Sequence, residues 1–90
     1  MPDDREKLQS TLSELRVQLE QSSLDPDIGQ RLRQAVAELE AILSGQRPKR
    51  AAVHSLTERL SEAALEFEAS HPTLAGTVGG VIDALGRMGI

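Results

Sequence analysis

The sequence predicts an all-α protein, a four-helix bundle made of two helical hairpins, and three observations carry this prediction. Large apolar residues recur three and four positions apart over most of the chain, as one face of an α-helix requires. Proline, glycine and serine interrupt this spacing at three places. The chain has 90 residues, enough for one domain over residues 1–90. We expect helices at about 3–22, 26–44, 51–69 and 72–88, with a basic linker at 45–50.

The first helix is predicted by four leucines with spacings of four, three and four residues: Leu8, Leu12, Leu15 and Leu19. This narrow apolar face is typical of a coiled-coil seam. Asp3 or Asp4 is expected to cap the start, because an acidic side chain there accepts from free backbone N–H groups and faces the positive end of the helix dipole.

The second helix is expected to begin at Asp25 as the N-cap, with Pro26 in the first helical position, where a missing N–H group costs nothing. Gly45 is expected to end it in the left-handed conformation. Only a few residues separate this helix from the first, so the two should form an antiparallel hairpin. Its expected apolar face is made of Ile28, Leu32, Val36 or Ala35, Leu39 and Leu43.

The third helix has two candidate starts, one near Pro48 and one at Ser55, which with Glu58 fits a capping box. Pro72 then breaks or sharply bends the chain, because proline disfavours helical backbone at His71. Two arrangements therefore stay open: a second antiparallel hairpin, or a long bent helix pair exchanged between subunits. The apolar face of the third helix is Val53, Leu56, Leu60, Ala63 or Ala64, and Phe67.

The last segment differs in composition, since Asp83 is its one charged residue between Pro72 and Leu85. Gly79 and Gly80 together cost about 2 kcal/mol of helix propensity relative to alanine, so packing must support this helix. We expect it to be the most buried helix or a subunit interface, most simply in a homodimer. The expected interface residues are Leu74, Gly76, Val78, Gly80, Ile82, Ala84 and Leu85.

Charge and composition exclude several function classes. The net charge is −4 and Phe67 is the single aromatic residue, which disfavours nucleic-acid binding. The basic linker residues Arg47, Lys49 and Arg50 keep a weak nucleic-acid role as an alternative. No apolar run is long enough to span a membrane, and no charge-flanked apolar leader is present, so we expect a cytoplasmic protein.

A metal-binding helical bundle is the other alternative. Glu68 and His71 have the Glu-x-x-His spacing that holds metal in di-iron bundles. A complete site would need a second such motif from a symmetric partner, whereas the expected inner face is apolar. The simpler interpretation is that His71 forms hydrogen bonds at the bend before Pro72. The chain has no cysteine and shows no nucleophile motif, so we expect no enzyme and no cofactor.

Three elements resemble a known family: Glu-Phe-Glu-Ala-Ser-His-Pro-Thr-Leu at 66–74, Ile-Asp-Ala-Leu at 82–85, and Met-Gly-Ile at 88–90. In them the chain resembles a family of short bacterial proteins known as a domain of unknown function. The amino-terminal half resembles it more loosely, as a helical hairpin rich in Leu, Glu and Arg. The resemblance implies a bacterial, soluble, mostly helical protein and implies no activity or ligand. The expected function is therefore protein–protein interaction or scaffolding through helix–helix contacts.

Overall fold

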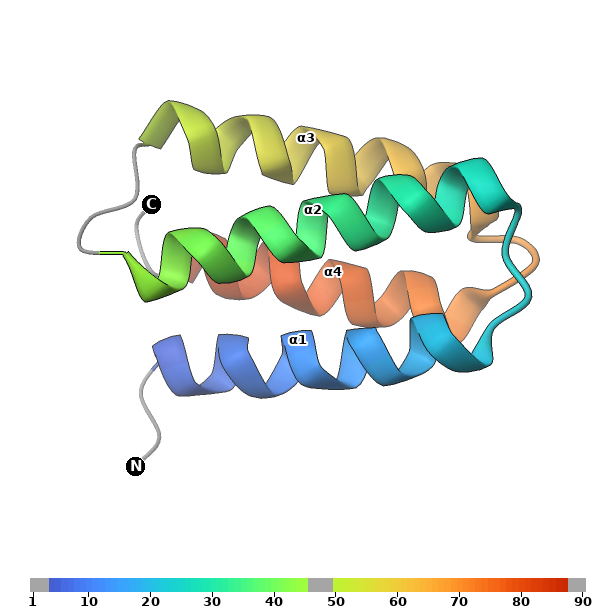
Figure 1. Ribbon diagram of the computed structural model, residues 1–90, viewed down its shortest axis with the longest axis horizontal. Coiled ribbons are helices and arrows are strands. Elements are labelled where there is room, and N and C mark those ends of the chain that lie inside the picture. Colours follow the sequence, from blue (N-terminus) through green and yellow to red (C-terminus); the bar gives the residue numbers. More distant parts are fainter. Residues whose placement is uncertain (1–3, 46–49, 88–90) are drawn as a thin grey trace.

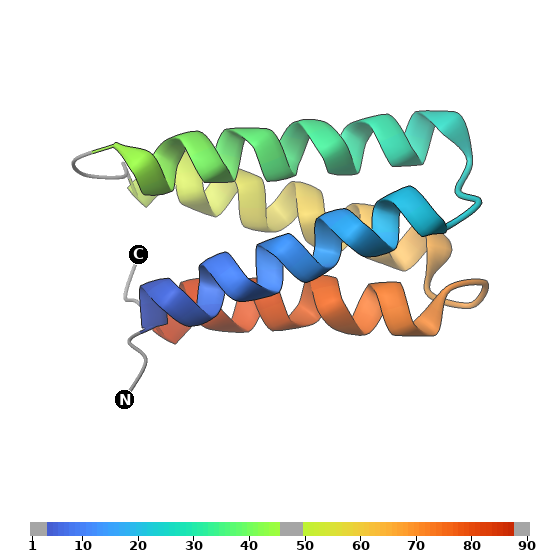
Figure 2. The ribbon, with the colours of Figure 1, turned by 60° about the horizontal axis from the view of Figure 1, so that its bottom comes forward.

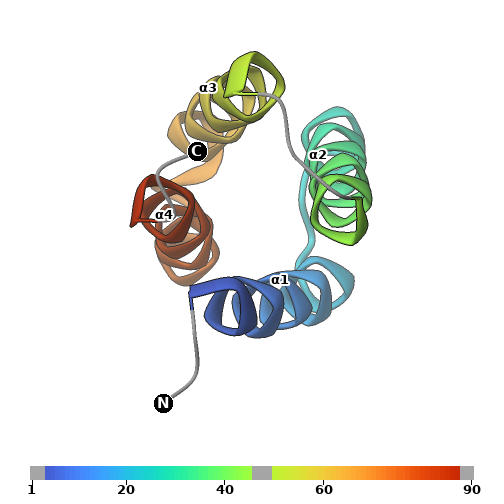
Figure 3. The same cartoon turned by 90° about the vertical axis from the view of Figure 1, so that its left-hand side faces the viewer.

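The computed structural model describes residues 4–45 and 50–87, which form a four-helix bundle (Figure 1). Neighbouring helices in the chain run antiparallel. Seen end-on, the helices stand in a ring in chain order, and the last one returns beside the first (Figure 3). The predicted all-α bundle is confirmed. The helices are α1 (Asp4–Gln21), α2 (Pro26–Ser44), α3 (Arg50–Phe67) and α4 (Pro72–Arg87).

The core lies on the axis of this ring, where the apolar faces of all four helices meet. Figure 2 shows how α1 runs along α4, with the α2–α3 pair above them. Within the described residues no polar or charged residue is buried, so burial of apolar surface is the main force that holds the helices together. The buried hydrophobic residues of the core are Leu8, Leu12, Leu15, Leu19, Leu32, Ala35, Val36, Leu39, Leu43, Val53, Leu56, Leu60, Ala63, Phe67, Leu74, Val78, Val81 and Leu85.

The start of α2 follows the sequence prediction. Asp25 is the N-cap, and its carboxylate oxygen Oδ1 accepts a hydrogen bond of 2.9 Å from the N–H group of Asp27. Pro26 occupies the first helical position. The carbonyl oxygen of Asp25 accepts from the Gly29 N–H group at 2.9 Å, which closes the first helical turn. Asp25 therefore satisfies a backbone donor that would otherwise be free.

The end of α2 differs from the prediction. Gly45 has φ −82° and ψ 177°, an extended conformation that other residues also adopt, so the expected left-handed cap is wrong. Its N–H group donates to the carbonyl oxygen of Ile42 at 3.2 Å, which tightens the last turn. The extended backbone then leads the chain directly out of the helix.

Helix α3 begins at Arg50, so the alternative start at Ser55 is wrong. Val53 explains the earlier start, because its side chain is only 1% exposed and belongs to the core face of this helix. Ser55 lies inside the helix and is exposed. The other candidate start, near Pro48, lies outside the described residues.

The chain reverses direction between α3 and α4, which rules out one long bent helix. Helix α3 ends at Phe67, whose carbonyl oxygen accepts hydrogen bonds from the N–H groups of Ser70 (3.0 Å) and His71 (2.8 Å). Pro72 begins α4, and the carbonyl oxygen of His71 accepts from Ala75 at 3.0 Å. Pro72 thus breaks the helix, and its fixed φ suits the first turn of the next one.

Candidate functional site

The residues expected to form an interface on the last helix fall into two groups. Leu74, Val78 and Leu85 are at most 3% exposed and belong to the core of this chain. They are unavailable to a second chain, so their assignment to an interface is corrected. Gly76 and Gly80 are exposed, and Ile82 and Ala84 are half-buried beside the core. Helix α4 is therefore not buried all round: a buried inner face is opposed by an exposed outer one.

We call this exposed side the outer face of α4, and it is rich in glycine. A carbon placed at the Cβ position of Gly76, Gly79 or Gly86 would meet nothing within 4 Å. Packing inside the chain therefore gives no reason for glycine at these positions. Glycine costs about 1 kcal/mol relative to alanine in a helix interior. The outer face consists of Pro72, Thr73, Gly76, Gly79, Gly80, Asp83, Gly86 and Arg87.

The outer face of α4 is electrically neutral. Its one acid and one base, Asp83 and Arg87, lie one turn apart and form an ion pair of 2.6 Å. On α3, by contrast, Glu58, Glu62 and Glu66 are all exposed. The outer face of α4 therefore combines small side chains with an internally compensated charge.

Charged residues elsewhere tie α2 to its neighbours. Arg59 of α3 donates two hydrogen bonds to Glu38 of α2, at 3.2 and 2.6 Å, and they hold the pKa of the Glu38 carboxyl below its usual value. Arg31 of α2 pairs with Glu66 of α3, and this hydrogen bond raises the pKa of Arg31. These pairs join α2 to α3 at the surface of their contact, and because their side chains are partly exposed each contributes little to stability.

A third interhelix pair, Arg16 of α1 with Glu40 of α2, stands between two surface cavities. We call this line of contact the α1–α2 seam. One cavity, of about 270 Å³, is lined by Gln9, Leu12, Ser13, Glu40, Leu43 and Ser44. The other, of about 250 Å³, is lined by Arg16, Leu19, Glu20, Arg33, Val36, Ala37 and Glu40.

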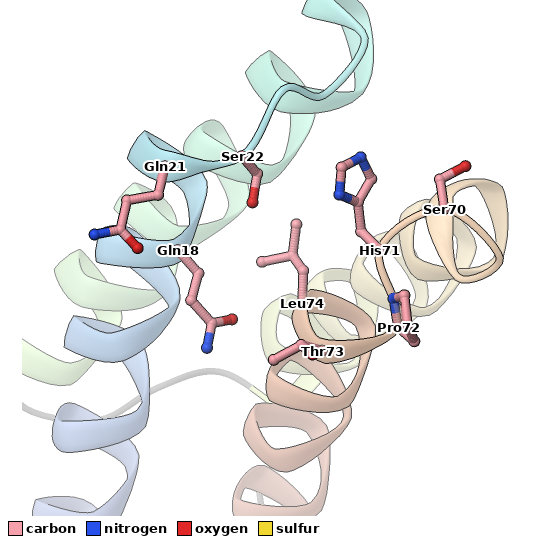
Figure 4. A pocket seen from close by; sticks show the side chains of 8 residues that line it. All are labelled: Gln18, Gln21, Ser22, Ser70, His71, Pro72, Thr73 and Leu74. Atoms are coloured by element: carbon pink, nitrogen blue, oxygen red, sulfur yellow. The ribbon is translucent and has the colours of Figure 1, made fainter.

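A cleft of about 430 Å³ opens where the end of α1 meets the start of α4 (Figure 4). The oxygen Oε1 of Gln18 is sheltered from solvent and has no hydrogen-bond partner among the described residues, while its amide nitrogen donates to Glu14 at 3.3 Å. Because Oε1 is already covered, a molecule in the cleft would not reach it without movement of the side chain. The lining residues are Gln18, Gln21, Ser22, Ser70, His71, Pro72, Thr73 and Leu74.

The cleft does not assemble a recognisable catalytic group. His71 is half-buried in its wall beside exposed Ser70, but the described lining contains no acid that would orient the imidazole. Glu68, the metal-ligand candidate, is exposed in the turn before it. Within residues 4–45 and 50–87, no three His, Cys, Asp or Glu residues come together as metal ligands.

The basic linker is described only at its end. Arg50 is exposed at the first position of α3, while Arg47 and Lys49 lie outside the described residues, as does the Met-Gly-Ile tail. The α1–α2 seam and the cleft were not predicted from the sequence. The hairpin of α1 and α2 was predicted, but the cavities of the seam depend on how closely these two helices pack, and the cleft depends on α1 lying beside α4; helical spacing gives neither.

No helix among the described residues is long and apolar enough to cross a membrane. A search of curated proteins and a search of solved structures give no match. The model of one protein family, described as a domain of unknown function (DUF4404), matches residues 8–90. This match covers most of α1 and all of α2, α3 and α4, including the α3–α4 turn. The chain therefore belongs to the DUF4404 family.

Proposed function

We propose that this chain is a small, non-catalytic cytoplasmic protein that acts through helix–helix contacts, and that the outer face of α4 binds a second copy of the chain. The observation that carries the proposal is the exposed glycine of this face. Gly76 and Gly79 weaken the helix and make no contact in the chain that a larger side chain would prevent. Close approach of a helix backbone from another chain would explain why these positions are glycine.

The neutral charge of the face supports a second copy as the partner. A chain of net charge −4 repels its own copies over most of its surface, so contact between copies favours a locally neutral region. The Asp83–Arg87 pair provides this on α4. A symmetric pair through α3 would instead bring exposed Glu58 and Glu62 of the two copies close together, while Glu66 is already paired with Arg31.

Introducing a charge on the face tests the proposal. Gly76→Glu adds a charged side chain at an exposed position whose Cβ atom would meet nothing within 4 Å outside its own stretch of helix, so the fold should tolerate it. In a dimer through α4, two such carboxylates would face each other at the contact. The dimer dissociation constant, measured by analytical ultracentrifugation, should rise at least about tenfold, a loss of about 1.4 kcal/mol.

The matched control is Ala41→Glu, which adds the same charge at an exposed position of α2. It should leave the dissociation constant within about twofold, because surface changes away from an interface have small effects. Equal weakening by both variants would mean that net charge alone controls association, and the assignment to α4 would then be abandoned. Cell fractionation of the untagged protein tests the cytoplasmic location.

A further inference from the structure

The α1–α2 seam differs from the other three contacts between neighbouring helices. Its apolar floor is made of Leu12 and Leu19 from α1 with Val36 and Leu43 from α2. Solvent-accessible cavities of about 270 and 250 Å³ lie directly over this floor, one after the other. Water therefore approaches the core at two places along this seam, whereas the cleft of about 430 Å³ between α1 and α4 lies at one end of that contact.

Among the described residues, α1 and α2 are joined across this seam by one ion pair, Arg16–Glu40. The Arg16 and Glu40 side chains are 56% and 41% exposed, and a pair so exposed to water contributes little. The opposite side of α2 makes two such pairs with α3, Arg31–Glu66 and Arg59–Glu38. They are similarly exposed, so the α2–α3 contact has two weak polar links where the seam has one. On α4, Val78 and Val81 are fully buried between α1 and α3.

We propose that the bundle opens first along the α1–α2 seam, as a partial opening that leaves its other three helix contacts packed. Because the helices form a ring, parting one contact opens the ring without detaching any helix from the remainder. The short connection at 22–25 keeps the end of α1 close to the start of α2. The two helices therefore separate most at the other end of the seam, where Gln9 and Ser44 line a cavity. The opening uncovers the apolar floor while the helices stay formed.

Thiol labelling under native conditions tests this proposal, because the chain contains no cysteine. The test pair is Val36→Cys in the seam and Val78→Cys on α4, at positions that are 4% and 0% exposed. Reaction with iodoacetamide reports how often each thiol is uncovered. After correction for the global stability of each variant, the Val36→Cys thiol should react about tenfold faster or more.

A second substitution tests whether the ion pair holds the seam closed. Arg16→Met, added to each cysteine variant, should speed labelling of Val36→Cys about two- to fivefold and leave Val78→Cys unchanged. The matched control is Arg87→Met, which removes a pair within α4. It should leave the Val36→Cys rate unchanged.

The proposal is overturned if both thiols are uncovered only by global unfolding, or if Arg16→Met speeds both reactions equally. Circular dichroism checks that each variant is folded. Should the valine variants fail to fold, Leu19→Cys in the seam and Leu85→Cys on α4 provide a second pair, since the two leucines are 3% and 2% exposed and Leu85 lines none of the cavities described above. Equal reaction of this pair after the same correction would also overturn the proposal.

Discussion

Gly80 of α4 lies against Thr11 of α1: a carbon at the Cβ position of Gly80 would stand 3.7 Å from the Thr11 methyl carbon Cγ2. This is an ordinary van der Waals distance, so the two helices leave room for one methyl group and little more. Gly76 and Gly79, on the same helix, have no such neighbour. The glycines of α4 therefore differ in what surrounds them, and they should respond differently to substitution.

Gly80→Ala should stabilise the chain. The new methyl group fills the space beside Thr11 without displacing it, and alanine favours the helix by about 1 kcal/mol over glycine. The melting temperature of the monomer, measured at a protein concentration too low for dimerisation, should rise by about 4–8 °C. A fall in melting temperature would show that α1 and α4 already touch more closely than the 3.7 Å distance indicates.

Gly79→Leu should weaken the dimer without lowering the stability of the folded monomer. Nothing in the same chain lies within 4 Å of the new Cβ atom, so the monomer should keep its fold and gain helix propensity. A leucine on the proposed interface would instead hold a second helix away. We expect an unchanged or higher melting temperature with a weaker dimer. A variant that unfolds, or one that dimerises as tightly as the wild type, would contradict this prediction.

Asp25→Ala should remove the N-cap of α2. The variant loses the hydrogen bond from the Asp27 N–H group to the carboxylate, which should lower the free energy of unfolding by about 1 kcal/mol in urea titrations. Asp25→Asn retains an oxygen acceptor and should lose only a few tenths of a kcal/mol. If the asparagine variant loses as much as the alanine variant, the cap does not act through this hydrogen bond.

The Glu38–Arg59 pair should make the free energy of unfolding depend on pH in the acidic range. Hydrogen bonds from Arg59 lower the pKa of Glu38 in the folded chain, so its contribution is complete above the unfolded pKa, about 4.5. It is lost as the pH falls through the lower pKa of the folded state. The effect should be only a few tenths of a kcal/mol, because the pair is exposed to solvent.

Urea titrations between pH 7 and pH 3 measure this contribution. Glu38→Gln should be slightly less stable than the wild type at pH 7, and the difference should shrink as the pH falls. Arg59→Met should behave in the same way. A difference that stays constant with pH would mean that the two side chains stabilise the α2–α3 contact by packing alone.

The helices and their core faces could be predicted from the sequence because both depend on local spacing. The leucines of α1 and the apolar positions of α2 and α3 recur at helical intervals, and all but half-buried Ile28 are buried as expected. The Asp25–Pro26 start followed equally well from local chemistry. Two predictions of helix ends were wrong. Gly45 is extended because the chain leaves α2 there without a left-handed turn, and α3 begins before Ser55 because Val53 is buried on its core face.

The candidate site was harder to predict because a glycine in a helix allows close packing either within one chain or between two chains. Gly76 and Gly80 could equally have lain against another helix of the same chain or against a second chain. The sequence also assigned Leu74, Val78 and Leu85 to the interface, although an inner stripe cannot serve both the core and a partner. The Arg16–Glu40 pair depends on how α1 and α2 are rotated and aligned within their predicted hairpin, which the spacing of apolar residues does not fix.

Light scattering of the wild-type chain over a wide range of concentration tests the central claim most directly. The monomer has a mass of 9.7 kDa, so association through α4 predicts twice this mass at high concentration and a fall toward it on dilution. A mass of one chain at every concentration would contradict the claim that the outer face of α4 binds a second copy.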